Sequence, residues 1–125
     1  MATRSVICVP FNTNSGQVYR CIYCHWDGYP EHQMPILEID YGKINDARRL
    51  VMLGHLSSLK TDKNWQGESM TPGPLYYYQR GDKDVDCTET TLENLKNHII
   101  DKYLGIEYVY VYKKRRGWLS SPGPF

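Results

Sequence analysis

The sequence predicts an α+β fold, in which helices pack on an antiparallel sheet and the elements follow the order ββααβαββ. β-Branched and alternating apolar runs on either side of a turn at residues 12–16 predict an N-terminal hairpin. Apolar residues spaced three and four apart predict helices in the middle of the chain. The 125 residues suit a single domain, 1–125. A domain of this size can bury about two-thirds of its unfolded surface without a metal or a disulfide.

The predicted elements are strands at 4–11 and 17–26, helices at 31–41 and 44–53, a loop at 55–74, a strand at 75–79, a helix at 90–104, and strands at 107–112 and 118–119. Proline is tolerated in a first helical turn, so we expect the regular part of the first helix to begin near Pro35. Gly54 suits the end of the second helix, and Thr90 with Glu93 matches a capping box that starts the third. We expect the tail 120–125 to be frayed.

The composition favours a binding protein and argues against two classes of partner. The 15 basic and 14 acidic residues give a net charge of +1, which is too small for a broad duplex-DNA footprint. No apolar run approaches the roughly 20 residues of a membrane span, and residues 1–5 do not resemble a signal peptide. The chain holds 11 Tyr against 2 Phe, and tyrosine prefers half-wet pockets and interfaces, which favours a binding protein.

Because the sequence shows neither a membrane span nor a signal peptide, we expect a cytosolic protein with four reduced cysteines, Cys8, Cys21, Cys24 and Cys87.

The most unusual motif is YCHWDGYP at Tyr23–Pro30. Such a run can build a pocket, because aromatic faces stack on planar ligands and polar tips fix their orientation. His25 oriented by Asp27 could instead act as a general base, although no nucleophile follows at a recognisable spacing. Trp26 and Tyr29 suit stacking on a base, and the alternative for Trp26 is an anchor in the core. The motif therefore predicts a binder first and an enzyme second.

Cys21, Cys24 and His25 have the short spacing of a zinc motif, but a second ligand pair is missing from the sequence. On a strand, Cys21 and Cys24 would also point to opposite faces. We therefore expect small buried thiols here, and neither a metal nor a cofactor.

A second aromatic set comprises Tyr76, Tyr78 and Arg80, which would share one face of the predicted 75–79 strand and its end. Rings stack on a base and a guanidinium clamps a phosphate, so this set suits a nucleotide. The alternative is a half-exposed strand that packs against a partner subunit, and in a homo-oligomer both can hold. The cationic run Lys113–Arg116 is either a solvated edge turn or a phosphate contact.

Five motifs together resemble a family of small phage proteins. They are Thr3–Ser5, Ile22–Pro30, the LGxLSSL pattern at Leu53–Leu59, Tyr78–Asp82 and Glu107–Tyr110. On these motifs the chain is similar to the first-described Thoeris anti-defence family, the phage sponges. The match spans nearly the whole chain, and Ile22–Pro30 is its most specific block. At 78–82 the chain departs from the Arg-Asp-Arg-Gly-Glu pattern that is commoner in that family.

The resemblance implies a viral anti-defence protein, without enzymatic activity, in the cytoplasm of the infected bacterial host. Such a protein sequesters cyclic ADP-ribose signals made by bacterial TIR-domain proteins, and some relatives resemble binders of cyclic oligonucleotides, an anti-CBASS activity. The resemblance also implies a homo-oligomer, a hexamer, with ligand bound between subunits.

We expect a small cyclic nucleotide to be bound without cleavage. Tyr78 or Trp26 would stack on the base, and Arg80 would clamp the pyrophosphate. The full set of expected ligand-binding residues is Arg4, Tyr23, His25, Trp26, Asp27, Tyr78, Gln79, Arg80 and Asp82. Two alternatives stay open: a phosphodiesterase-like enzyme with His25 as base, and a protein-interaction inhibitor of a host defence effector such as CRISPR.

Overall fold

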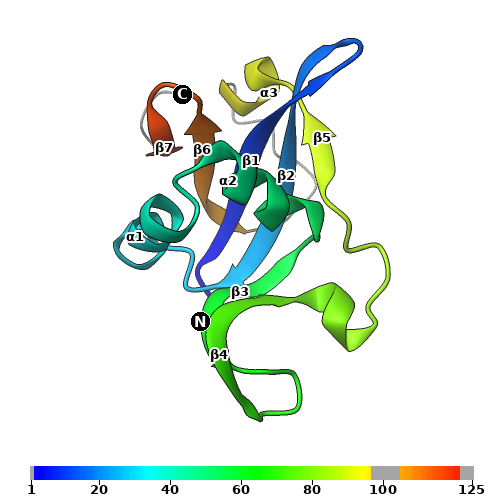
Figure 1. Cartoon of the computed structure of the whole chain (residues 1–125), viewed down its shortest axis with the longest axis vertical. Helices are drawn as coiled ribbons and strands as arrows, with labels where there is room; N and C mark the ends of the chain where they lie inside the picture. The colour runs from blue at the N-terminus through cyan, green and yellow to red at the C-terminus, as the bar shows by residue number, and fades with distance from the viewer. Residues whose placement is uncertain (1, 97–104, 122–125) are drawn as a thin grey trace.

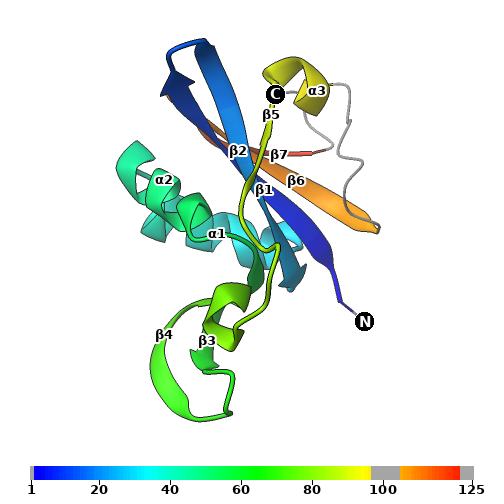
Figure 2. The ribbon, with the colours of Figure 1, turned by 90° about the vertical axis from the view of Figure 1, so that its right-hand side faces the viewer.

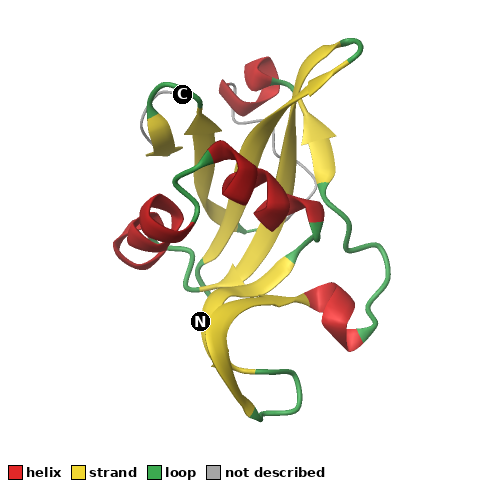
Figure 3. Cartoon of the chain, viewed as in Figure 1, coloured by secondary structure: helices red, strands yellow, loops and turns green. Residues whose placement is uncertain are grey.

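The computed structural model describes residues 2–96 and 105–121, and every structural statement below concerns these residues. The elements are β1 (Arg4–Thr13), β2 (Gly16–Trp26), α1 (Pro30–Asp40), α2 (Ile44–Met52), β3 (Leu56–Lys63), β4 (Ser69–Tyr76), the 3₁₀ helix η1 (Tyr77–Arg80), β5 (Thr88–Thr90), α3 (Leu92–Lys96), β6 (Ile106–Lys113) and β7 (Gly117–Ser120). The described chain is mostly β, with seven strands in one mixed, curled half-barrel sheet and three short α-helices (Figures 1 and 3). The strand order is β4-β3-β2-β1-β6-β7, and β5 also pairs with β2.

The predicted antiparallel sheet, ordered ββααβαββ, is wrong. The observed sheet is mixed, because β1 pairs with β6 and β2 pairs with β3 in parallel. The expected loop at 55–74 instead contains β3 and most of β4, which project from the body as a hairpin (Figure 1). Much of this hairpin is exposed, so the apolar alternation that indicates a strand is weak there. Parallel pairing also joins segments far apart in the chain, and no local pattern specifies it.

The N-terminal hairpin and the first two helices are confirmed close to their expected bounds. However, α1 begins at Pro30 and not near Pro35. The Tyr29 carbonyl accepts the backbone N–H groups of His32 and Gln33 at 3.1 and 2.9 Å, which completes a first turn before Pro35 is reached. The longest described helix is α1, with 11 residues, and no described helix has the length and apolarity to cross a membrane.

The start of α3 lies later than the capping-box prediction placed it. The Thr91 hydroxyl accepts the backbone N–H of Asn94 at 3.1 Å, so Thr91 caps the helix in place of Thr90. The predicted continuation of this helix over 97–104 lies outside the described residues.

The prediction of a frayed tail at 120–125 is wrong at Ser120 and Ser121. Ser120 belongs to β7, and Ser121 is buried with its hydroxyl accepting the Val109 backbone N–H at 2.9 Å. This hydrogen bond continues the contact between β6 and the chain beyond β7. The rest of the predicted tail, 122–125, lies outside the described residues.

The sheet separates two apolar cores. Figure 2 shows α1 and α2 on one face of the sheet and α3 on the other. On β2, Ile22 and Cys24 belong to the core beneath α1 and α2, whereas Tyr19 and Cys21 belong to the core beneath α3. Successive strand residues point to opposite faces, so β2 supplies both cores.

Several tyrosines belong to the core. The composition had instead predicted that the tyrosines lie on recognition surfaces. Tyr110 and Tyr112 of β6 are buried, and their hydroxyls donate to the carbonyls of Gly28 and Gly42 at 2.5 and 2.9 Å. Burial also raises the pKa of Tyr110. A tyrosine can fill a core once its hydroxyl has a partner, so the excess of Tyr does not measure exposed recognition surface.

We expect Gly54→Ala to destabilise the fold strongly. Gly54 has a φ of 93°, and a Cβ there would lie 2.2 Å from the Val85 carbonyl oxygen, which accepts the His55 N–H. The combined strain and clash should lower the free energy of unfolding by at least about 2 kcal/mol in urea denaturation. The matched control is Gly67→Ala, which has a φ of 77° with nothing within 4 Å and should lose about 1 kcal/mol. Equal losses in the two variants would contradict the contact with Val85.

Candidate functional site

Tyr23 and His25 of β2 form the centre of the candidate site. Because Ile22 and Cys24 point beneath α1 and α2, Tyr23 and His25 face the opposite side of the sheet. The Tyr23 hydroxyl lies 2.5 Å from Nδ1 of His25. Trp26 meets the His25 ring edge-on, with centroids 4.8 Å apart, and is 45% exposed. The imidazole therefore lies between two aromatic side chains.

The charge of Arg4 acts on both members of this pair. Burial lowers the pKa of His25, and the nearby Arg4 guanidinium lowers it further. Burial raises the pKa of Tyr23, and Arg4 opposes that rise. The His25 imidazole is therefore neutral at pH 7, and its Nδ1 can accept a hydrogen bond from the Tyr23 hydroxyl.

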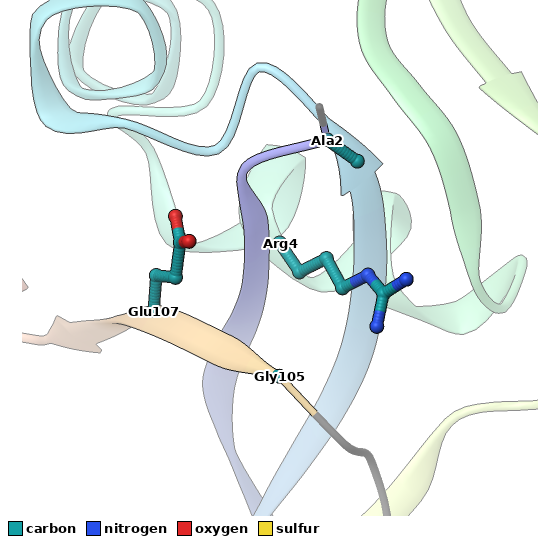
Figure 4. Close-up of a pocket in the computed structure, with 4 residues that line it drawn as sticks. All are labelled: Ala2, Arg4, Gly105 and Glu107. Atoms are coloured by element: carbon teal, nitrogen blue, oxygen red, sulfur yellow. The ribbon is translucent and has the colours of Figure 1, made fainter.

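Arg4 also lines an open groove of about 270 Å³ together with Ala2, Gly105 and Glu107 (Figure 4). The Arg4 side chain extends from β1 toward β2, whereas Glu107 extends from β6 in a different direction. Gly105 leaves room for the guanidinium, because a Cβ at this position would lie 3.0 Å from Arg4 Nη1. The groove thus offers a cation and a carboxylate to a small polar ligand.

His55 supports β2 beneath the site. One edge of β2 is shared, with Tyr19–Cys21 pairing with β5 and Cys24–Trp26 pairing with β3. Between these two stretches, the Tyr23 backbone N–H donates to Nδ1 of His55 at 3.0 Å. The buried imidazole of His55 therefore satisfies a donor that neither neighbouring strand reaches.

The predicted strand at 75–79 is confirmed at Leu75 and Tyr76 and is wrong from Tyr77 onward, where the chain forms η1. The Gln79 side-chain oxygen accepts the Tyr76 backbone N–H at 2.8 Å and closes the start of the turn. In a 3₁₀ helix, side chains spread around the axis and do not alternate. Tyr76, Tyr78 and Arg80 therefore do not line one strand face.

Arg80 is stacked and paired at the end of η1. Its guanidinium lies over the rings of Trp65 and Tyr77, 4.4 and 5.3 Å from their centroids. Its Nε and Nη2 atoms donate to the two carboxylate oxygens of Asp82 at 2.8 and 2.6 Å. These hydrogen bonds hold the pKa of Asp82 below its usual range. The arrangement presents an exposed guanidinium on an aromatic platform.

Tyr77 connects this platform to β2. Its backbone N–H donates to the His55 carbonyl at 3.1 Å, and Nδ1 of His55 accepts the Tyr23 backbone N–H, so His55 joins η1 to β2. We call the series Arg4, Tyr23, His25, Tyr77 and Arg80 the Arg4–Arg80 row. The row combines two guanidinium groups, two phenols and a neutral imidazole, which can stack on a planar ring and donate hydrogen bonds to an anion.

The remaining expected residues lie at the margins of this row or outside it. Asp27 is exposed at the end of β2 with a φ of 56°, and Tyr29, not Asp27, is the N-cap of α1. Tyr78 packs on Tyr76, with ring centroids 5.6 Å apart, and the Tyr76 hydroxyl donates to the Leu50 carbonyl of α2. Tyr78 therefore lies on the α2 side of the sheet, whereas Tyr23 and His25 face away from it.

The structure also bears on the zinc-like spacing. Cys21 and Cys24 belong to different cores on opposite faces of β2. Burial raises the pKa of Cys24 to about 12, and Gln33 donates to its Sγ at 3.2 Å. Among the described residues, no group of three or more His, Cys, Asp or Glu gathers around a common point that could hold a metal ion.

Sequence reasoning missed the contributions of Tyr77, Trp65 and His55 to the site. Tyr77 was expected to point away from Tyr76 and Tyr78 on a strand, so its place in the row depends on the 3₁₀ turn. Trp65 lies in a segment that was expected to be a loop, 55–74, so no role in the site was assigned to it. No local pattern could identify the backbone contact of His55.

No protein-family model, curated protein or solved structure matches this chain, so the site is interpreted from its own geometry.

We expect Arg4→Gln to raise the pKa of His25 toward 6.5, because it removes the smaller of the two causes that lower it. Titration of the histidine ring resonances by NMR measures this shift. Arg4→Lys keeps the charge and should keep most of the depression. An unchanged His25 titration in Arg4→Gln would place the guanidinium away from the imidazole.

The same depression predicts a pH dependence of stability. Between the pKa of His25 in the folded protein and about 6.5, the unfolded chain binds the proton more readily. The contribution of His25 to the free energy of unfolding is therefore complete above pH 6.5 and declines as the pH falls through this window. Urea denaturation at pH 7 and pH 5 should show a smaller decline for His25→Asn than for the unsubstituted protein.

Proposed function

We propose that this protein is a binding protein that sequesters a small cyclic nucleotide without cleaving it. The observation that carries this proposal is the Arg4–Arg80 row, which combines Arg4 and the Tyr23–His25 pair with the stacked Arg80 guanidinium. Rings stack on a nucleobase, and guanidinium groups donate to phosphate oxygens in a fixed fork. Arg4 would hold one anionic group in the groove, and the Trp65–Tyr77–Arg80 platform would receive a base or a second anionic group.

The energetics of such a site are adequate for sequestration. Nanomolar binding requires about −12 kcal/mol. Stacking of one base contributes roughly 1–3 kcal/mol, and each hydrogen bond to a charged group contributes roughly 1.5–3 kcal/mol. One stack with three or four charged contacts approaches this requirement before association costs are subtracted. A preformed row, held by β2 and His55, keeps those costs small.

The groove favours a site completed by a second copy of the chain. Its volume of about 270 Å³ is below the roughly 300–1,000 Å³ of pockets that enclose small ligands. A neighbouring subunit placed over the groove would supply the missing walls. We therefore include a homo-oligomer, with the hexamer implied by the resemblance, in the proposal.

The biological role follows from the resemblance described above. A protein of the anti-Thoeris sponge type would act in the cytoplasm of the infected bacterium and remove cyclic ADP-ribose isomers before they reach their effector. Cyclic oligonucleotides are the second ligand class to be tested. The departure at 78–82 coincides with η1, so this turn is where ligand preference would differ from the commoner pattern.

One observation favours a second candidate, an enzyme acting on the same ligands. The Tyr23 hydroxyl and the neutral His25 imidazole are 2.5 Å apart beside Arg4, which is a geometry compatible with proton transfer at a phosphodiester. Incubation with each cyclic nucleotide, heat release and chromatography separate the two functions. Recovery of intact ligand supports sequestration, whereas a new product supports the enzyme.

We expect Arg4→Gln to weaken binding of the best ligand by roughly 10- to 100-fold, because a charge-assisted contact is lost. Thermal-shift screening with cyclic ADP-ribose isomers and cyclic di- and trinucleotides selects the ligand, and titration calorimetry measures the affinity. Arg49→Gln is the matched control, because it removes the same charge from an exposed position on α2, on the opposite face of the sheet. Equal affinities for both variants would remove Arg4 from the site.

We expect Asp82→Asn and Arg80→Ala to change binding in opposite directions. Asp82 occupies the Nε–Nη2 edge of the Arg80 guanidinium, so a ligand phosphate that binds this edge has to replace it. Asp82→Asn should therefore strengthen binding by up to about fivefold, as expected for release of an exposed ion pair. Arg80→Ala should weaken binding. A loss of affinity in both variants would instead show that Asp82 contacts the ligand directly.

A further inference from the structure

Cys8 and Cys21 form a close thiol pair in the core beneath α3. They are direct partners in the antiparallel register of β1 and β2, and their Sγ atoms are 2.6 Å apart. Both are free thiols in the structure, with exposed fractions of 0% and 4%. Neither residue is needed for the Arg4–Arg80 row.

The backbone at this pair suits a disulfide. Directly opposed residues in an antiparallel pair have Cα atoms about 4.5–5.5 Å apart. Disulfides join Cα atoms about 4.4–6.8 Å apart, so the bond requires side-chain rotation but no movement of the strands.

We propose that Cys8 and Cys21 are a modification site that closes to an intramolecular cross-strand disulfide when the protein meets a two-electron oxidant. An S–S bond forms between the two Sγ atoms as both S–H bonds are lost, and two protons and two electrons leave the protein. With a hydroperoxide as oxidant, the O–O bond breaks and accepts these electrons and protons, giving water and an alcohol. With a dialkyl disulfide as oxidant, two thiols are released.

The other two cysteines have different surroundings. Cys24 lies opposite Ser5 in the hairpin register and belongs to the core on the other face of β2. Cys87 precedes β5 and packs against that same core. The sequence motif Cys21-x-x-Cys24 therefore cannot close, although its spacing resembles that of redox pairs.

Burial controls the rate of the reaction. Desolvation raises the pKa of Cys8, so little thiolate is present at neutral pH and attack on an oxidant is slow. Leu95 of α3 belongs to the same buried cluster as the pair, so this packing also limits the access of an oxidant. The product should be more stable than the dithiol, because the bond closes the 8–21 loop in the unfolded chain.

The test is oxidation of the folded protein with diamide, which accepts two electrons and two protons to become a hydrazine. The intact mass should fall by about 2 Da, and alkylation after unfolding should label Cys24 and Cys87 but not Cys8 and Cys21. Peptide mapping should recover one cross-linked pair, residues 8 and 21. The melting temperature should rise by roughly 5–10 °C and return on reduction.

Two sets of variants act as controls. Cys87→Ser should retain the mass loss and the cross-link, whereas Cys8→Ser and Cys21→Ser should each abolish them. The mapping of the unsubstituted protein decides the proposal even where a serine variant folds poorly. A cross-link that includes Cys24 or Cys87, or four alkylated cysteines after prolonged oxidation, overturns it.

Discussion

Gly28 allows the end of β2 to press directly against β1, and this contact positions much of the molecule. Its N–H donates to the Thr3 carbonyl at 2.8 Å, and its carbonyl accepts the Tyr110 hydroxyl at 2.5 Å. A Cβ here would come within 2.7 Å of both Thr3 and Ser5, so no other residue fits without a shift of β1. The contact joins β1, β2 and β6 at one end of the sheet. Arg4 is thereby held beside Tyr23 and His25.

The YCHWDGYP motif divides into residues that build the fold and residues that face outward. Gly28 and Cys24 serve packing, and Tyr29 starts α1. Alternation along β2 was sufficient to predict that Tyr23 and His25 share a face, because a strand has a side-chain period of two. The position of Arg4 near Tyr23 and His25 depends on the hairpin register, in which Ser5 lies opposite Cys24. The turn residues in the sequence do not specify that register uniquely.

The errors of prediction have two physical origins: the sheet depends on contacts between segments distant in the chain, whereas the turn after Tyr76 depends on a local side-chain hydrogen bond. The parallel pairings of β1 with β6 and of β2 with β3 have no local signature. The segment after Tyr76 had the β-rich composition of a strand, but the Gln79 side chain captures the Tyr76 N–H and favours a 3₁₀ turn. Helix spacing in α2 and strand alternation in β6 are local and strong, and both elements were predicted close to their bounds. Local pattern thus accounts for individual elements, whereas tertiary contacts decide the sheet and assemble the row.

Under the proposed function, the charge distribution around the row would let a nearly neutral chain select a small anion over a polyanion. Glu107 lines the groove with Arg4, and Asp82 pairs with Arg80, so a carboxylate group belongs to the surroundings of both cations. Beyond the Debye length, about 8 Å at physiological ionic strength, these opposite charges largely cancel, and a long duplex gains little from approaching. At contact distance the guanidinium and the carboxylate would act separately. The phosphate of a nucleotide would replace Asp82 on the guanidinium, and its base would stack on the neighbouring rings. Selection under the proposed function would therefore depend on close fit, which favours a compact ring compound over an extended polymer.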